Sequence, residues 1–239
     1  MTAYGTFVII SSYFGSGPPP SPPSGPDFIR VWQAVAMTTG VCAVLLAAGA
    51  GRRFAGPGHK LRAALGGSSV FAHALETVLA SGIGRVVVVV GVDDLSDEIS
   101  RVVDALPATG RVPVTVVNNS QWAHGMATSL HAGFAAADAL GMDAVVVGLA
   151  DQPRIEPDAW RRLADCTCEL AVATYDGERG HPVRIARRWW SDIPAVGDEG
   201  ARQLLRKEAE IVCEVACRGT PTDVDTTDDL ARISGRTSP

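Results

Sequence analysis

An apolar run that stops abruptly at glycines constrains the fold of this chain more than any other segment. Residues 41–48 read Val-Cys-Ala-Val-Leu-Leu-Ala-Ala, and Gly49-Ala50-Gly51 and Arg52-Arg53 follow directly. A short, continuously apolar stretch before a glycine turn is typical of a buried strand in a parallel sheet. Backbone N–H groups in such a turn, with cations beside them, favour an anion such as a nucleotide phosphate. We therefore expect a phosphate-binding loop directly after this strand.

Strand-like and helix-like segments alternate along the rest of the chain. The expected strands are 41–47, 85–90, 112–117, 143–149, 170–174, 182–185 and 211–215. The expected helices are 68–80, 95–106, 126–140, 157–166 and 198–207. Strands separated by helices imply right-handed crossovers and a mainly parallel sheet with helices on both faces. We expect an α/β fold with a Rossmann-like, three-layer arrangement and a small antiparallel element in its second half.

A single folded domain is expected at residues 39–234, between two segments that lie outside it. Residues 15–26 contain only Gly, Pro and Ser, which neither pair well as a strand nor continue a helix. We interpret residues 1–38 as an extension outside the fold and residues 235–239 as a tail. Met37 lies just before the first strand, and mass spectrometry of the native N-terminus tests the hypothesis that the protein starts there.

Composition limits the classes of partner. The net charge of −5 argues against a general nucleic-acid binder, because no basic surplus exists to neutralise a phosphate backbone. No apolar run approaches the roughly 20 residues that a membrane-spanning helix needs. We therefore expect a cytoplasmic protein that acts on small molecules and binds neither nucleic acid nor membrane.

The chain has an odd number of cysteines without regular spacing, which does not indicate a disulfide framework. We expect reduced structural thiols. The alternative is a metal site that combines the pairs Cys166/Cys168 and Cys213/Cys217.

The glycine loop matches neither of two common phosphate-binding motifs. Phe54 stands where a dinucleotide fingerprint has its third glycine, and Pro57 stands where a P-loop requires lysine. What remains is a glycine turn followed by Arg52, Arg53 and Lys60, whose side chains are suited to phosphate oxygens. The alternative interpretation is an ordinary turn with solvated charges.

Two acidic segments are candidate metal ligands. Asp151 follows the fourth expected strand, at residues 143–149. A carboxylate at that place suits Mg²⁺ held jointly with phosphate oxygens. The alternative is that Asp151 caps the helix that follows. Asp225 is a candidate ligand only if it meets Asp151 in space. Near it, Thr226 or Thr227 is expected to cap the terminal helix, with acidic residues in its first turn.

Two further segments suit a ligand that approaches closely. Gly125 and Ser129 lie where a helix is expected to begin, and either serve a ligand or act as ordinary helix-start residues. His181 stands between Gly180 and Pro182 and is either functional or a packed histidine.

In this order, the segments between about Val41 and Leu230 resemble the MobA-like nucleotidyltransferases, most closely their molybdenum cofactor cytidylyltransferase branch. The resemblance implies catalytic roles for Arg53, Lys60 and Asp151, and Mg²⁺ ligands at Asp151 and Asp225. It implies that the nucleotide is bound by Leu46, Ala47, Ala48, Gly49, Ala50, Gly51, Arg52, Arg53, Lys60, Asn119, Gly125, Ser129 and Asp151. It implies that the acceptor is bound by Gln152, Pro153, Gly180, His181, Pro182 and Asp198.

The activity implied by this resemblance is Mg²⁺-dependent transfer of CMP from CTP to the terminal phosphate of the molybdenum cofactor, a phosphorylated pterin, with release of pyrophosphate. Relatives that transfer GMP usually carry Ala-Gly-Gly in the first loop, so Ala47-Ala48-Gly49 favours CTP. The chain departs from the family in residues 55–59, a longer path to Lys60. A molybdoenzyme or its maturation chaperone is the implied partner.

Three alternatives remain at this point. The first is the same chemistry with GTP or with another phosphorylated acceptor. The second, of another class, is a non-catalytic partner that binds nucleotide or cofactor during molybdoenzyme maturation. A Rossmann-type oxidoreductase is the third, and Phe54 disfavours it.

Overall fold

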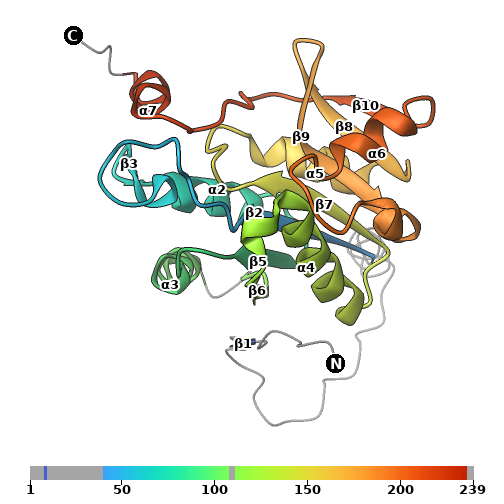
Figure 1. Ribbon diagram of the computed structural model, residues 1–239, viewed down its shortest axis with the longest axis horizontal. Helices are drawn as coiled ribbons and strands as arrows, with labels where there is room; N and C mark the ends of the chain where they lie inside the picture. The colour runs from blue at the N-terminus through green and yellow to red at the C-terminus, as the bar shows by residue number, and fades with distance from the viewer. Residues whose placement is uncertain (1–7, 10–39, 108–110, 236–239) are drawn as a thin grey trace, which may run out of the picture.

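The computed structural model describes residues 8–9, 40–107 and 111–235, which form a central sheet between layers of helices (Figure 1). The order of strands across the sheet is β1 (Val8–Ile9), β6 (Val114–Asn118), β5 (Val86–Val90), β2 (Val41–Ala47), β7 (Ala144–Leu149), β9 (Glu178–Ala186), β8 (Leu170–Tyr175) and β10 (Cys213–Ala216). Strands β6, β5, β2 and β7 are parallel, and β10 is parallel to β8. Strand β9 runs antiparallel to both β7 and β8, which confirms the expected antiparallel element.

Alternating side chains of the central strands pack against helices on opposite faces of the sheet. On β2, Leu45 belongs to one buried cluster and Val44 to the other. The first cluster includes side chains of α2 (Val70–Leu79), α3 (Ser96–Ala105) and α5 (Pro157–Asp165). The second includes side chains of α4 (Met126–Ala139), α6 (Arg202–Lys207) and the 3₁₀ segment η3 (Arg187–Asp192). The predicted three-layer α/β fold is therefore confirmed.

The remaining short elements lie around this frame. They are η1 (Lys60–Arg62), β3 (Ala64–Leu65), β4 (Ser68–Ser69), η2 (Trp122–His124) and α7 (Thr227–Ile233). None of the helices in the described part of the chain is both long and apolar enough to cross a bilayer.

Two elements differ most in length from the sequence prediction, whereas the others shift by a few residues at their ends. The helix expected from residue 198 begins only at Arg202, because Gly197 and Gly200 have φ values of 110° and 54°, outside the right-handed helical region. Strand β9 is longer than expected because it forms a hairpin with β8. Asp176 and Gly177 both have positive φ, as a tight two-residue hairpin turn requires.

Helix starts settle which acidic residues are caps. Glu156 precedes α5, and Pro157 occupies its first turn, so Asp151 does not cap that helix. At α7, the Thr226 side chain accepts a bond from the Asp229 N–H, while the Asp229 carboxylate accepts one from the Thr226 N–H. This reciprocal capping box confirms Thr226 as the cap.

The N-terminal extension is described only at Val8–Ile9, which pair with β6. The rest of the expected extension, and residues 236–239 of the expected tail, lie outside the described residues. The expectation that all cysteines are reduced is wrong in this structure. Cys168 and Cys213 form a disulfide because they stand at the starts of two neighbouring parallel strands.

Candidate functional site

A cleft of about 440 Å³ opens beyond the carboxyl ends of β2 and β7. Ligands of parallel α/β sheets commonly bind at this edge, and the volume is in the range of small-molecule sites. The cleft brings together most of the predicted nucleotide-binding residues, namely Leu46, Ala47, Ala48, Gly49, Ala50, Gly51, Arg52, Arg53, Lys60, Gly125, Ser129 and Asp151.

The glycine loop forms one wall of the cleft and leaves backbone accessible. A Cβ atom at Gly49 would meet nothing within 4 Å, so this position offers open space beside the chain. Gly51 has a φ of 60°, and a Cβ there would lie 3.0 Å from the Lys60 Cγ. Nε2 of His59 lies 2.9 Å from the Gly49 carbonyl oxygen and links the two ends of the loop. Glycine at 51 is therefore needed for both its conformation and the close passage of Lys60.

Lys60 lies between the two candidate metal ligands. Its Nζ donates to Asp151 Oδ2 at 2.5 Å and to Asp225 Oδ1 at 2.8 Å. Arg53 Nη2 lies 2.8 Å from the other Asp225 oxygen. Burial acts to lower the pKa of Lys60, but the two carboxylates outweigh burial and hold this pKa above its usual range. The longer path through residues 55–59 therefore delivers the ammonium group to the acidic pair.

The backbone holds the two aspartates together although 74 positions of sequence numbering separate them, from 151 to 225. The Val224 N–H donates to the Asp151 carbonyl oxygen at 2.9 Å. Gln152 Nε2 donates to Asp223 Oδ1 at 2.8 Å beside this contact. Asp225 therefore meets Asp151 in space, as a shared metal site requires, whereas Asp223 pairs with Gln152.

The donor set of this acidic pair fits a divalent cation. Oδ1 of Asp151 is buried and has no hydrogen-bond partner, an uncommon state for a buried carboxylate oxygen. Asp225 supplies a second carboxylate on the other side of the Lys60 ammonium group. Hard oxygen ligands of this kind are those that Mg²⁺ takes in proteins, usually together with phosphate oxygens.

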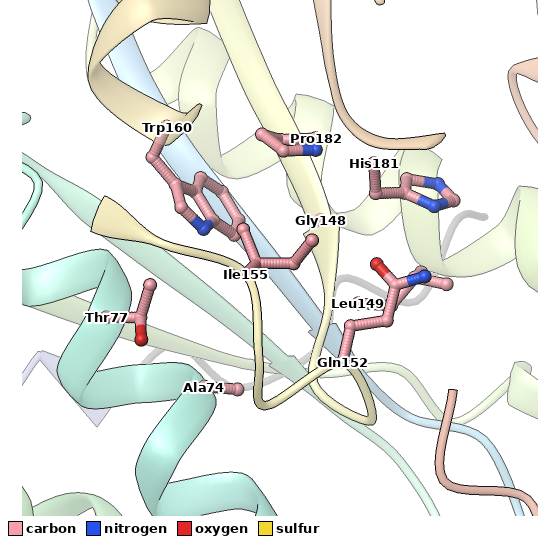
Figure 2. A pocket seen from close by; sticks show the side chains of 9 residues that line it. All are labelled: Ala74, Thr77, Gly148, Leu149, Gln152, Ile155, Trp160, His181 and Pro182. Carbon is pink, nitrogen blue, oxygen red and sulfur yellow. The ribbon is translucent and has the colours of Figure 1, made fainter. Parts of the chain in front are cut away.

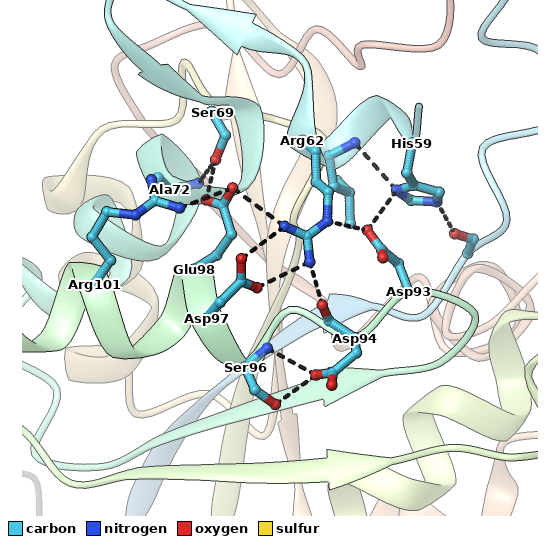
Figure 3. A network of polar contacts seen from close by, with 12 residues as sticks. His59, Arg62, Ser69, Ala72, Asp93, Asp94, Ser96, Asp97, Glu98 and Arg101 are labelled. Carbon is cyan, nitrogen blue, oxygen red and sulfur yellow. Dashed lines mark hydrogen bonds and ion pairs between the residues drawn. The ribbon is translucent and has the colours of Figure 1, made fainter. Parts of the chain in front are cut away.

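A charged network fastens the turn that carries Lys60 (Figure 3). The Arg62 guanidinium contacts the carboxylates of Asp93, Asp97 and Glu98, and donates to the Asp94 carbonyl oxygen. These partners lie in the loop after β5 and at the start of α3, so η1 is tied to a separate βα unit. The carboxylates raise the pKa of Arg62 above its usual range.

The opposite wall of the cleft is formed by η2 and the start of α4. Trp122, Ala123 and Met126 line it, and Asp198 reaches it from the loop before α6. Gly125 has a φ of 106°, and the backbone of Gly197 lies so close that a Cβ at Gly125 would overlap it. The requirement for glycine at 125 is therefore a backbone approach between two loops.

Asn119 lies behind this wall and does not line the cleft. Its Nδ2 donates to Thr128 Oγ1 at 2.9 Å and to Ser129 Oγ at 3.0 Å, and all three side chains are buried. Its Oδ1 accepts the Gln121 N–H. Asn119 therefore positions Ser129 and the start of α4.

The predicted acceptor residues divide between two places. Asp198 lines the main cleft, whereas Gln152, His181 and Pro182 line a narrow neighbouring gap against Trp160 (Figure 2). Burial lowers the pKa of His181 from its usual 6.5 to about 4, so its ring is neutral at neutral pH. Pro153 and Gly180 line neither space.

Several residues of the site were not among those predicted from the sequence. Trp122 and Met126 lie inside a segment already singled out, and their position between Asn119 and Ser129 was the available signal. His59 and Arg62 flank Lys60, but their partners are distant in sequence, so no local pattern identified them.

Comparison with known proteins shows similarity over most of the chain. Residues 43–212 match the family described as the MobA-like NTP transferase domain. The chain is 32% identical to nicotine blue oxidoreductase of Paenarthrobacter nicotinovorans, covering 81% of this chain and 96% of that protein. It is 31% identical to the purine catabolism protein PucB of Bacillus subtilis strain 168, covering 80% and 94%.

A solved structure described as a nucleotidyl transferase from Methanothermobacter thermautotroptrophicus (Mth528) has the same fold. It superposes with a TM-score of 0.66 at 24% identity, covering 82% of this chain and 96% of that chain. The family match spans well over half of the sequence and contains most of β2, all of β7 and the residues that line the cleft. The chain therefore belongs to the MobA-like NTP transferase family.

Proposed function

We propose that this protein transfers CMP from CTP to the terminal phosphate of the molybdenum cofactor or a closely related phosphorylated pterin. The observation that carries the proposal is the pair Asp151 and Asp225, held by Lys60 at the foot of a glycine loop. This arrangement combines cations for phosphate oxygens with carboxylates for a divalent metal.

The chain's own residues account for binding and charge neutralisation. The backbone of residues 49–51 and the side chains of Arg53 and Lys60 would hold the triphosphate. Both cations contact the aspartates in this structure, so nucleotide binding requires them to share or exchange these partners. A Mg²⁺ ion held by Asp151 and Asp225 would neutralise negative charge that develops on the phosphate oxygens.

The transfer itself needs no covalent nucleophile from the protein. An oxygen of the acceptor's terminal phosphate attacks the α-phosphorus, the bond from that phosphorus to the bridging oxygen breaks, and pyrophosphate leaves. The attacking phosphate is already ionised near neutral pH, so no strong general base is required. Lys60 and Arg53 are placed to stabilise charge on the phosphates during this step.

CTP is preferred in this proposal because the loop reads Ala47-Ala48-Gly49 and not Ala-Gly-Gly. Ala48 is 3% exposed, and its carbonyl oxygen would lie 2.6 Å from a Cβ placed at Gly91. The loop is therefore packed tightly against Gly91, the residue that follows β5.

A pyrophosphate-release assay tests the proposal with CTP, GTP, ATP or UTP, Mg²⁺ and the phosphorylated pterin. We expect release with CTP, loss of turnover in Asp151→Asn, and no loss in the exposed-site variant Asp176→Asn. Release with GTP alone, or only with another phosphorylated acceptor, would replace the substrate assignment. Nucleotide binding without release would favour a non-catalytic maturation partner.

A redox reaction is the second candidate, because one relative is named an oxidoreductase. Oxidation of NADH or NADPH by a redox partner in the same cleft, without pyrophosphate release, would favour that activity. Loss of that oxidation in Lys60→Ala and Asp151→Asn would then place the redox reaction in the cleft.

A further inference from the structure

Three cysteines converge far from the cleft. Cys166 follows α5, Cys168 precedes β8, and Cys213 begins β10. Their sulfur atoms all lie within 4.8 Å of one another. Cys168 and Cys213 form the disulfide, and Cys166 retains a free thiol. The cluster lies at the starts of β8 and β10, whereas the cleft lies at the opposite edge of the sheet, beyond the ends of β2 and β7.

A half-buried cation stands beside this cluster. Arg184 of β9 donates from Nε to the Cys168 carbonyl oxygen at 2.9 Å and from Nη1 to the Ala164 carbonyl oxygen at 3.0 Å. Burial lowers the pKa of Arg184 and the adjacent Cys166 raises it in part, but a guanidinium stays protonated in proteins. A fixed positive charge favours neighbouring thiolates over thiols.

We propose that the reduced forms of Cys166, Cys168 and Cys213 bind one thiophilic divalent ion of the Zn²⁺ class. A dithiol reductant supplies two electrons and two protons to open the disulfide and is itself oxidised to a disulfide. The ion then displaces three thiol protons and forms three metal–sulfur bonds. Arg184 offsets the single negative charge that remains on a three-thiolate Zn²⁺ complex.

Reduction lets the three sulfur atoms take the spacing of zinc ligands: the bonded sulfurs of Cys168 and Cys213 move apart, and Cys166 Sγ moves closer to them. Tetrahedral Zn²⁺ with Zn–S bonds of about 2.3 Å separates its sulfur ligands by about 3.8 Å. No sulfur atom of the cluster lies more than 4.8 Å from another, and the Cys168–Cys213 pair separates once the disulfide is reduced. All three residues are half-buried, so an ion and a water as fourth ligand can enter.

The proposal also fits the compartment expected from the sequence. Reducing cytoplasm disfavours disulfides, so Cys168 and Cys213 would be free thiols there. A bound ion would then hold the start of β10 against β8 in place of the disulfide. The chain continues from β10 to Asp225, so either link anchors the segment that delivers this aspartate to the cleft.

Titration of the reduced full-length chain with Cd²⁺ tests the site, because thiolate-to-metal charge transfer gives an ultraviolet band that grows with the number of bound thiolates. We expect saturation at one equivalent, competition by Zn²⁺, and at least tenfold weaker binding in Cys166→Ser with a smaller band. Cys217→Ser is the matched control, because this half-buried free thiol follows β10 and lies outside the cluster. The control variant should bind Cd²⁺ like the parent.

The oxidised parent chain provides a second control that involves no substitution. It offers only the Cys166 thiol at the cluster and should show no tight one-equivalent binding. Equal affinity in the reduced parent and Cys166→Ser, or equal binding before and after reduction, would overturn the proposal. Circular dichroism of each sample checks that the fold is retained. Because no nucleotide is present, the result is independent of the proposed transferase activity.

Discussion

At the scale of single residues, Lys60 has the most demanding position in the molecule. It is 8% exposed and is one of only two lysines in the chain, the other being Lys207. Its ammonium group is bonded to both carboxylates that the proposed mechanism assigns to a metal. The same side chain thus offsets the charge of the acidic pair in this structure and is the phosphate ligand in the proposed complex.

Replacing Lys60 separates these two roles. We expect Lys60→Ala to lower turnover by a factor of about 100 or more, the size of effect seen when one charge-stabilising donor is removed. Mg²⁺ alone should raise the Tm of this variant more than that of the parent, because Asp151 and Asp225 have lost a competing cation. Lys207→Ala, at an exposed lysine, is the control. Parent-like turnover in Lys60→Ala would contradict the assigned role.

His181 predicts a pH dependence of stability. Its pKa is about 4 in the folded chain, against about 6.5 when unfolded, because burial disfavours the charged ring. Between these values the unfolded chain binds the extra proton, so the free energy of unfolding falls as pH falls through this window, by at most about 3 kcal/mol. Above about pH 6.5 both states are neutral at this residue and the full contribution is present.

Urea unfolding of the parent and His181→Gln between pH 4 and pH 7 measures this contribution. Carboxylates that titrate in the same range affect both proteins equally and cancel in the comparison. The variant should lose less stability on acidification than the parent. His124→Gln, at an exposed histidine, should retain the slope of the parent. Parallel curves for the parent and His181→Gln would show that the His181 ring does not titrate as described.

At the scale of elements, the close approach of α4 to β2 positions the wall of the cleft. Gly133 lies in the middle of α4, where glycine normally weakens a helix, but a Cβ there would lie 2.7 Å from Val44 Cγ1. The missing side chain allows the helix to pack against the sheet, and Ser129 lies one turn earlier on the same helix.

We expect Gly133→Ala to destabilise the protein by about 1–3 kcal/mol through overpacking, despite the better helix propensity of alanine. Gly84→Ala is the matched control, since a Cβ at Gly84 meets nothing within 4 Å and its φ is not positive. That variant should be neutral or slightly stabilised. Thermal unfolding of both variants checks the contrast, and equal Tm values would contradict the packing argument.

Across elements, the sequence predicted best what depends on local pattern. The five valines of β5 indicated a strand covered on both faces, and Thr226 with Asp229 indicated a helix start. The length of β9 was underestimated because a hairpin partner, and not local hydrophobicity, determines where it ends. The Arg62 network was not found because its acidic partners lie more than 30 positions away in the chain.

At the scale of the whole molecule, the sheet gathers residues from several distant segments at one edge. Sequence motifs predicted each segment, but only the fold brings Lys60, Asp151 and Asp225 into contact. The disulfide escaped prediction for the same reason, since β8 and β10 become neighbours only in the folded sheet. Substrate specificity depends on the detailed chemistry of the cleft, whereas the family match indicates the class of reaction.

The central claim is that the cleft binds a nucleoside triphosphate through a metal held by Asp151. Thermal-shift titrations with CTP, GTP, ATP, NADH or NADPH, with and without Mg²⁺, test it most directly in the parent and Asp151→Asn. A ligand at 100 times its Kd stabilises by about 2.7 kcal/mol, which is a Tm rise of about 5–10 °C for a chain of this size. We predict a Mg²⁺-dependent rise with CTP that Asp151→Asn loses. A rise with NADH or NADPH alone, or a CTP shift that is unchanged in Asp151→Asn, would contradict the account.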